Sequence, residues 1–242
     1  MKHKGLIYML WDFIDAVRNA DIWSVVSILL AIAALTLVCM PVHECAHAWA
    51  ANKLGDPTAR NQGRLSLRPS RHLDIIGTIM IIAIGVGYAK PVSVNPYNFR
   101  KPKRDMALTA AAGPISNLLM GVIFLVLYNL IRIIPLPLSM SNSFVAIVLF
   151  VLQYAMIQTA SINISLAVFN LIPVPPFDGS RILGLILPDR LYFKIMQYEQ
   201  IIYIAVMILL IGGFVSGPIS TFTRTVFNAV YWLVSLPFGL IG

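Results

Sequence analysis

Long runs of apolar residues, separated by short polar loops, dominate the hydrophobicity pattern of the chain. Most runs approach or exceed the roughly 18–20 apolar residues that a helix needs to cross a bilayer. They cover residues 22–51, 73–89, 107–134, 144–172, 199–215 and 222–241. The pattern predicts an all-α polytopic membrane protein with about five transmembrane helices. No linker is long enough to separate two domains, so we expect a single domain over residues 1–242.

Two shorter features lie outside these runs. Residues 5–17 are mostly apolar but carry Asp12 and Asp15, which is typical of an amphipathic helix in the membrane interface and differs from a cleavable signal peptide. In the polar loops, residues 65–67 and 92–94 alternate apolar and polar side chains. This alternation predicts short β-strands at the membrane surface, with ordinary loop structure as the alternative. An exposed strand edge there would accept an extended peptide.

The composition supports a membrane protein. Of the 242 residues, 58% are hydrophobic and only 12% are charged, and the mean hydropathy is +0.81. Roughly a quarter of the residues in soluble domains are charged. The net charge of +8 comes largely from Lys and Arg in short loops, where cytoplasmic retention and anionic lipid headgroups explain it, so nucleic acid is not an expected partner. Cys39 and Cys45 are too few for a disulfide framework.

The strongest chemical signal is HECAH at residues 43–47, at the end of the first long apolar run. On a helix, His43 and His47 lie one turn apart on the same face. Two imidazoles so placed bind one Zn²⁺, and the intervening Glu44 reaches a water as general base. Ionisable groups within a membrane segment are costly and are usually functional. A metal site is therefore favoured over a chance match. Pro41, two residues earlier, is expected to loosen the helix there.

A catalytic zinc site needs a third protein ligand, and the residues leave more than one candidate. His72 lies in the basic loop RPSRHLD, where a surface histidine is the simpler interpretation. Glu199 would give a different class of zinc site, but no surrounding pattern supports it. Asp178 follows the proline-rich stretch NLIPVPP, which must leave the helix. Its carboxylate is therefore placed to meet a neighbouring helix or to cap the next one.

The motifs HECAH, AGPISN and NLIPVPPFDG, in this order and within apolar segments, resemble the site-2 protease family (peptidase M50) of intramembrane zinc metalloproteases. The loops GRLSLRPSRHLDIIGT and AKPVSVNP resemble its compact branch, which lacks PDZ and CBS domains. The resemblance covers about residues 35–190, within an expected catalytic core of about 22–190. Many members carry Gly where this chain has Ser180. Because Ser is small, we interpret this departure as tolerated.

The resemblance implies specific roles for residues of this chain. His43, His47 and Asp178 would bind Zn²⁺, one ion per chain, with Glu44 as catalytic acid and base. Asn170 would stabilise the oxyanion, and Asn117 would be structural or substrate-binding. The implied function is hydrolysis of peptide bonds within or near transmembrane segments of membrane-protein or peptide substrates, in a prokaryotic cell membrane. The alternative is a catalytically silent metal-binding membrane scaffold or transporter.

A shared metal constrains the topology. The HECAH motif and Asp178 lie near the ends of their apolar runs, so an even number of crossings must separate them. Residues 107–134 and 144–172 supply two crossings, so residues 73–89 must not cross. We therefore predict a re-entrant segment, bent at Gly77, Gly85 and Gly87. The flanking loops are both rich in Lys and Arg, which places them and the metal toward the cytoplasm.

Overall fold

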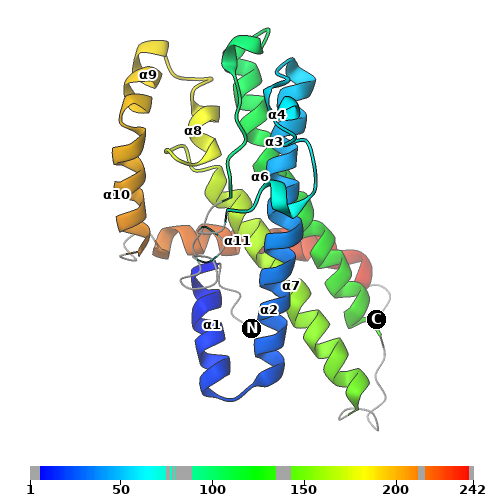
Figure 1. Cartoon of the computed structure of the whole chain (residues 1–242). Coiled ribbons are helices and arrows are strands. Elements are labelled where there is room, and N and C mark those ends of the chain that lie inside the picture. The colour runs from blue at the N-terminus through cyan, green and yellow to red at the C-terminus, as the bar shows by residue number, and fades with distance from the viewer. Residues whose placement is uncertain are drawn as a thin grey trace.

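The computed structural model describes residues 6–74, 77, 79, 89–134, 143–211 and 216–239, and almost all of its regular structure is helical (Figure 1). The elements are α1 (Leu6–Arg18), α2 (Ile22–Ala34), the π-helix η1 (Leu35–Cys39), α3 (Met40–Leu54), α4 (Thr58–Asn61), the 3₁₀ turns η2 (Pro69–Arg71) and η3 (Pro96–Asn98), α6 (Pro102–Arg132), α7 (Phe144–Asn170), α8 (Asp178–Leu183), α9 (Asp189–Gln197), α10 (Glu199–Ile211) and α11 (Ser216–Gly239).

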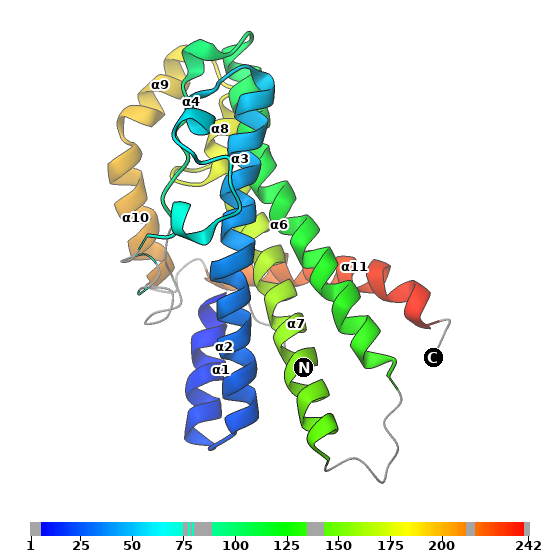
Figure 2. The same cartoon turned by 45° about the vertical axis from the view of Figure 1, so that its right-hand side comes forward.

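Three helices are long and apolar enough to cross a membrane. The first is Ile22–Leu54, which joins α2, η1 and α3 into 33 residues; the others are Pro102–Arg132 with 31 residues and Phe144–Asn170 with 27. They confirm the all-α membrane-type fold. The predicted total of about five is not confirmed, because among the described residues α10 has only 13 residues and α11 lies across α6 and α7 (Figures 1 and 2).

The core lies where the three long helices pack together. Its buried centre includes Leu35 and Cys39 from η1, Leu125 from α6 and Ile164 from α7. Helices α6 and α7 approach closely at Gly121, where a Cβ atom would lie 2.6 Å from Cγ1 of Ile164. Because η1 continues directly into α3, this packing fixes the position of α3 along α6 and α7. The predicted amphipathic N-terminal segment forms α1, which packs along α2 (Figure 2).

The strands predicted at 65–67 and 92–94 are wrong, because both segments are described and neither forms a strand. Turn contacts and side chains take the backbone groups that a ladder would need. The Ser66 N–H donates to the Arg64 carbonyl at 2.9 Å, and the Ser66 carbonyl accepts from the His72 ring at 2.6 Å. Directly after the second segment, the Asn95 N–H donates to the Asp56 carboxylate at 2.7 Å.

The predicted re-entrant segment, including Gly85 and Gly87, lies mostly outside the described residues. Its two ends are described, and they lie side by side. Leu73 and Ala89 form an isolated antiparallel bridge, and the Lys90 N–H donates to the His72 carbonyl at 2.8 Å. The chain therefore leaves and rejoins the described structure at one place.

Candidate metal centre

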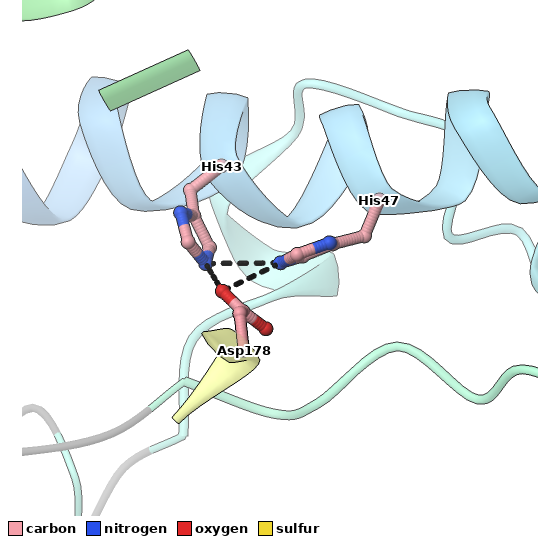
Figure 3. A group of neighbouring side chains, drawn as sticks. All are labelled: His43, His47 and Asp178. Carbon is pink, nitrogen blue, oxygen red and sulfur yellow. Dashed lines mark hydrogen bonds and ion pairs between the residues drawn. The ribbon is translucent and has the colours of Figure 1, made fainter. Parts of the chain in front are cut away.

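The structure brings His43, His47 and Asp178 together from two elements that are distant in sequence (Figure 3). The two histidines project from successive turns of α3, and Asp178 is the first residue of α8. Nε2 of His43 lies 3.1 Å from Nε2 of His47. Oδ2 of Asp178 lies 3.6 Å from Nε2 of His43 and 3.4 Å from Nε2 of His47. These three atoms form a small triangle.

The turn between α7 and α8 delivers Asp178 to this triangle. After α7 ends at Asn170, prolines prevent further helix. Gly179 then packs against the end of α7, where a Cβ atom would lie 2.3 Å from the Leu171 carbonyl oxygen. The Ser180 hydroxyl donates to the Phe177 carbonyl at 2.7 Å, so a serine is readily accommodated here. The N-cap of α8 is Phe177 rather than Asp178, and the Asp178 carboxylate is directed at the histidines (Figure 3).

The position of the proton on the His47 ring indicates what kind of ion the three donor atoms can bind. Its Nδ1 donates to the backbone carbonyl of Thr109 at 2.8 Å, so Nδ1 carries the proton in the neutral ring. Nε2 is then a lone-pair acceptor, and it faces the Asp178 carboxylate, which is also an acceptor. Oδ2 of Asp178 is buried without a hydrogen-bond partner. Facing lone pairs repel one another unless a proton or a metal cation lies between them, and this group of acceptors is therefore suited to bind a metal ion.

The spacing of the donors fits zinc. Zinc binds His nitrogen at about 2.0–2.1 Å and carboxylate oxygen at about 2.0–2.2 Å, so tetrahedral ligands lie roughly 3.3–3.6 Å apart. The separations here run from 3.1 to 3.6 Å. Three protein ligands with a fourth position open is the arrangement typical of a catalytic zinc site rather than a structural one.

Helix α6 supplies two contacts to the histidines that sequence reasoning missed. Besides the Thr109 carbonyl, Gly113 lies directly against both rings. A Cβ atom at Gly113 would lie 2.3 Å from Nε2 of His47 and 2.5 Å from Cε1 of His43. Gly113 belongs to the AGPISN motif, from which only Asn117 was selected. A glycine before Pro114 inside an apolar helix was the available signal for close helix approach.

The other residues predicted for the site are not among the three converging donors. Glu44 is half-buried on α3, and its carboxylate interacts with the backbone N–H of Val92. Asn117 is only 2% exposed and interacts with the His43 ring, which favours a structural role over substrate binding. Asn170 is half-buried at the end of α7, next to the residues on which Gly179 packs.

The alternative third ligands lie elsewhere. Oε1 of Glu199 faces Nη2 of Arg181 at 3.7 Å and does not join the histidines. The interpretation of His72 as a surface histidine is wrong, because its side chain is fully buried. Its Nε2 donates to the Ser66 carbonyl at 2.6 Å, which closes the 66–72 loop. The sequence did not indicate that His72 is buried, because the basic residues around it are typical of a surface loop. Its side chain is buried only because the loop folds back on itself.

His72 predicts a pH dependence for this loop. Burial lowers the pKa of His72 below its ordinary value of 6.5; the hydrogen bond to Ser66 opposes this shift, and the positive charge of Arg64 adds to it. The unfolded loop therefore binds more protons than the closed loop. The closed loop is most stable above pH 6.5, and its stability decreases as the pH falls below that value. Hydrogen exchange of residues 64–74, corrected for intrinsic rates, should quicken over that range. A His72→Gln variant should lose the pH dependence, and a wild-type loop with constant protection would contradict this account.

Three long apolar helices and a partly buried His–His–Asp triangle that could hold a metal ion define the class of an integral membrane protein with a candidate metal centre. Comparison with known proteins specifies the family. Residues 131–213 match the model of "Peptidase family M50". YwhC of Bacillus subtilis (strain 168) is 36% identical over 189 residues, which are 75% of this chain and 82% of that protein. The chain therefore belongs to peptidase family M50.

More distant relatives agree. Rip2 of Mycolicibacterium smegmatis is 24% identical over 227 residues, which are 92% of this chain and 78% of that protein. A Methanocaldococcus jannaschii protein is 28% identical over 109 residues, 45% of this chain and 49% of that protein. All three relatives carry names that begin "Putative zinc metalloprotease". No solved structure matches the chain.

Proposed function

We propose that this protein is a zinc metalloprotease that hydrolyses peptide bonds within or near transmembrane segments of membrane-protein substrates. The observation that carries the proposal is the position of the donor triangle. His43 lies 11 residues before the end of the apolar helix Ile22–Leu54, which is roughly 16 Å along the helix axis. A metal site at that depth serves substrates that are themselves in the bilayer.

Each residue of the site has a distinct task in this proposal. His43, His47 and Asp178 hold the zinc, which when bound supplies a Lewis acid and lowers the pKa of its water toward ~7. Glu44 takes a proton from the attacking water onto its carboxylate and then donates it to the leaving amine nitrogen. The Asn170 amide donates a hydrogen bond to the substrate carbonyl oxygen as negative charge develops on it.

Contacts between the two basic loops support a cytoplasmic position for the site. The loops are tied together by hydrogen bonds from Asn95 and Asn98 to Asp56 and from Lys90 to His72, so they lie on the same side of the bundle. The Leu73–Ala89 bridge agrees with a re-entrant segment between them. Lys and Arg concentrate on cytoplasmic loops. Accessibility labelling that placed residues 60 and 100 on opposite sides of the membrane would contradict this topology.

Metal removal tests the function. The purified protein in liposomes should cleave a co-reconstituted transmembrane peptide, lose cleavage when a chelator strips the metal, and recover it when Zn²⁺ is returned. An Asp178→Ala variant should recover neither zinc nor cleavage, because two imidazoles alone hold zinc weakly. Glu199→Ala is the matched control, since Glu199 faces Arg181, and it should recover both. Cleavage that survives full metal removal would overturn the proposal.

A further inference from the structure

Asp56 is a buried carboxylate that the proposed chemistry does not use. It follows the end of α3, where Gly55 adopts a left-handed conformation with φ +113°. The Asp56 N–H donates to the Ala51 carbonyl at 2.9 Å, so its backbone is fixed to the last turn of α3. The Asp56 side chain is fully buried, although it lies just past the end of α3. Burying a carboxylate is costly unless hydrogen bonds replace its water.

Two of the four donors that replace this water come from a segment about 40 residues later, and the other two come from Thr58. Oδ2 of Asp56 accepts from the Asn95 N–H at 2.7 Å, and Oδ1 accepts from Nδ2 of Asn98 at 2.7 Å. Thr58 adds its N–H at 3.0 Å and its hydroxyl at 2.5 Å. Burial acts to raise the pKa of Asp56, but these hydrogen bonds outweigh it and hold the pKa below the ordinary 3.8. The group is therefore charged at neutral pH.

The segment that Asp56 holds is the one that reaches Glu44. Val92 is three residues before Asn95, so at most about 10 Å of chain separates them. Pro91 and Pro96 bound the segment and keep the residues before them extended. Its other end is fixed because the Lys90 N–H donates to the His72 carbonyl. With both ends held, little slack remains at Val92, whose backbone N–H interacts electrostatically with the Glu44 carboxylate.

We propose that Asp56 is a positioning residue, which clamps the 91–96 segment to the end of α3 and thereby holds the Val92 N–H against the Glu44 carboxylate. The inference rests on the proposed function of Glu44. A backbone N–H beside the carboxylate favours one orientation of the Glu44 side chain. Misplacing a catalytic group by about 1 Å can cost up to 10²-fold in rate. Zinc binding does not involve this contact.

An Asp56→Asn variant tests the clamp, because it keeps the size of the side chain but turns one acceptor into a donor. Hydrogen exchange in residues 89–99 should quicken about tenfold or more, while exchange in α3, α6 and α7 and the zinc content stay as in the wild type. The kcat per bound zinc should fall roughly tenfold to a hundredfold with little change in KM. Asp21→Asn is the matched control, because Asp21 also accepts an N–H and a hydroxyl, both from Ser24, at the far end of the first long helix.

An Asn98→Asp variant should lose protection and kcat in the same way, since two carboxylates then face each other where the Asn98 amide donated to Asp56. Unchanged kcat in Asp56→Asn despite faster exchange would overturn the proposal. A fall in kcat explained by lost zinc or by faster exchange throughout would overturn it equally, in favour of a purely structural role. If the wild type cleaves nothing, the proposed function fails, yet local exchange still reports whether the clamp exists.

Discussion

A Glu44→Gln variant is expected to lose peptide cleavage by roughly 10³-fold while retaining its zinc. Gln has nearly the shape of Glu but does not accept and return a proton at neutral pH. The three donor atoms of the metal centre come from His43, His47 and Asp178, so removing the charge at Glu44 leaves the ligand set complete. Cleavage of a transmembrane peptide in liposomes and zinc content by atomic emission are the two measurements.

Glu199→Gln is the matched control for this experiment. Glu44 and Glu199 are the only glutamates in the chain, and Glu199 lies near the surface, where its partner Arg181 is 3.7 Å away. Losing such a pair costs about 0–1 kcal/mol of stability, so cleavage should stay near the wild-type rate. Full activity in Glu44→Gln would exclude Glu44 as acid and base. A wild type that binds zinc but cleaves no substrate would support the silent scaffold or transporter instead.

The hydrophobicity pattern predicted the parts of the fold that depend on local sequence. Apolar length gave the spans at 22–51, 107–134 and 144–172, because a bilayer sets the length of a helix. The spacing of His43 and His47 gave half of the metal centre, because helix geometry alone puts both rings on one face. Asp178 was one of several candidates from the residues themselves, and the resemblance to a family selected it.

The missed features depend on contacts made by backbone groups, which residue types along the sequence do not reveal. The Thr109 carbonyl orients His47, yet any residue type offers a carbonyl, so no sequence pattern reveals it. The predicted strands at 65–67 and 92–94 failed because side chains bind backbone groups in or beside them: His72 binds the Ser66 carbonyl, and Asp56 binds the Asn95 N–H just after 92–94. The burial of His72 likewise follows from loop closure, which composition does not report.

The second large effect is expected at Gly113, the residue of α6 that lies against both histidine rings. In a Gly113→Ala variant the new methyl group would be 2.3 Å from Nε2 of His47 and 2.5 Å from Cε1 of His43. Carbon and ring atoms need about 3.5 Å, so the rings or the helix must move by roughly 1 Å. Zinc–ligand distances tolerate only about ±0.2 Å. We therefore expect zinc affinity to fall by at least roughly a hundredfold, and cleavage to be lost with it.

Gly121→Ala separates this effect from general disturbance of α6. A methyl group at Gly121 would lie 2.6 Å from Cγ1 of Ile164, so it strains packing against α7 without touching a ligand. That variant should unfold at a lower temperature yet keep its zinc and its cleavage. Gly113→Ala should keep its helical content and lose the metal, because the His47 ring cannot move away without giving up its hydrogen bond to Thr109 on the same helix. Wild-type zinc binding in Gly113→Ala would mean that the rings are free to shift, and that close approach of α6 does not define the site.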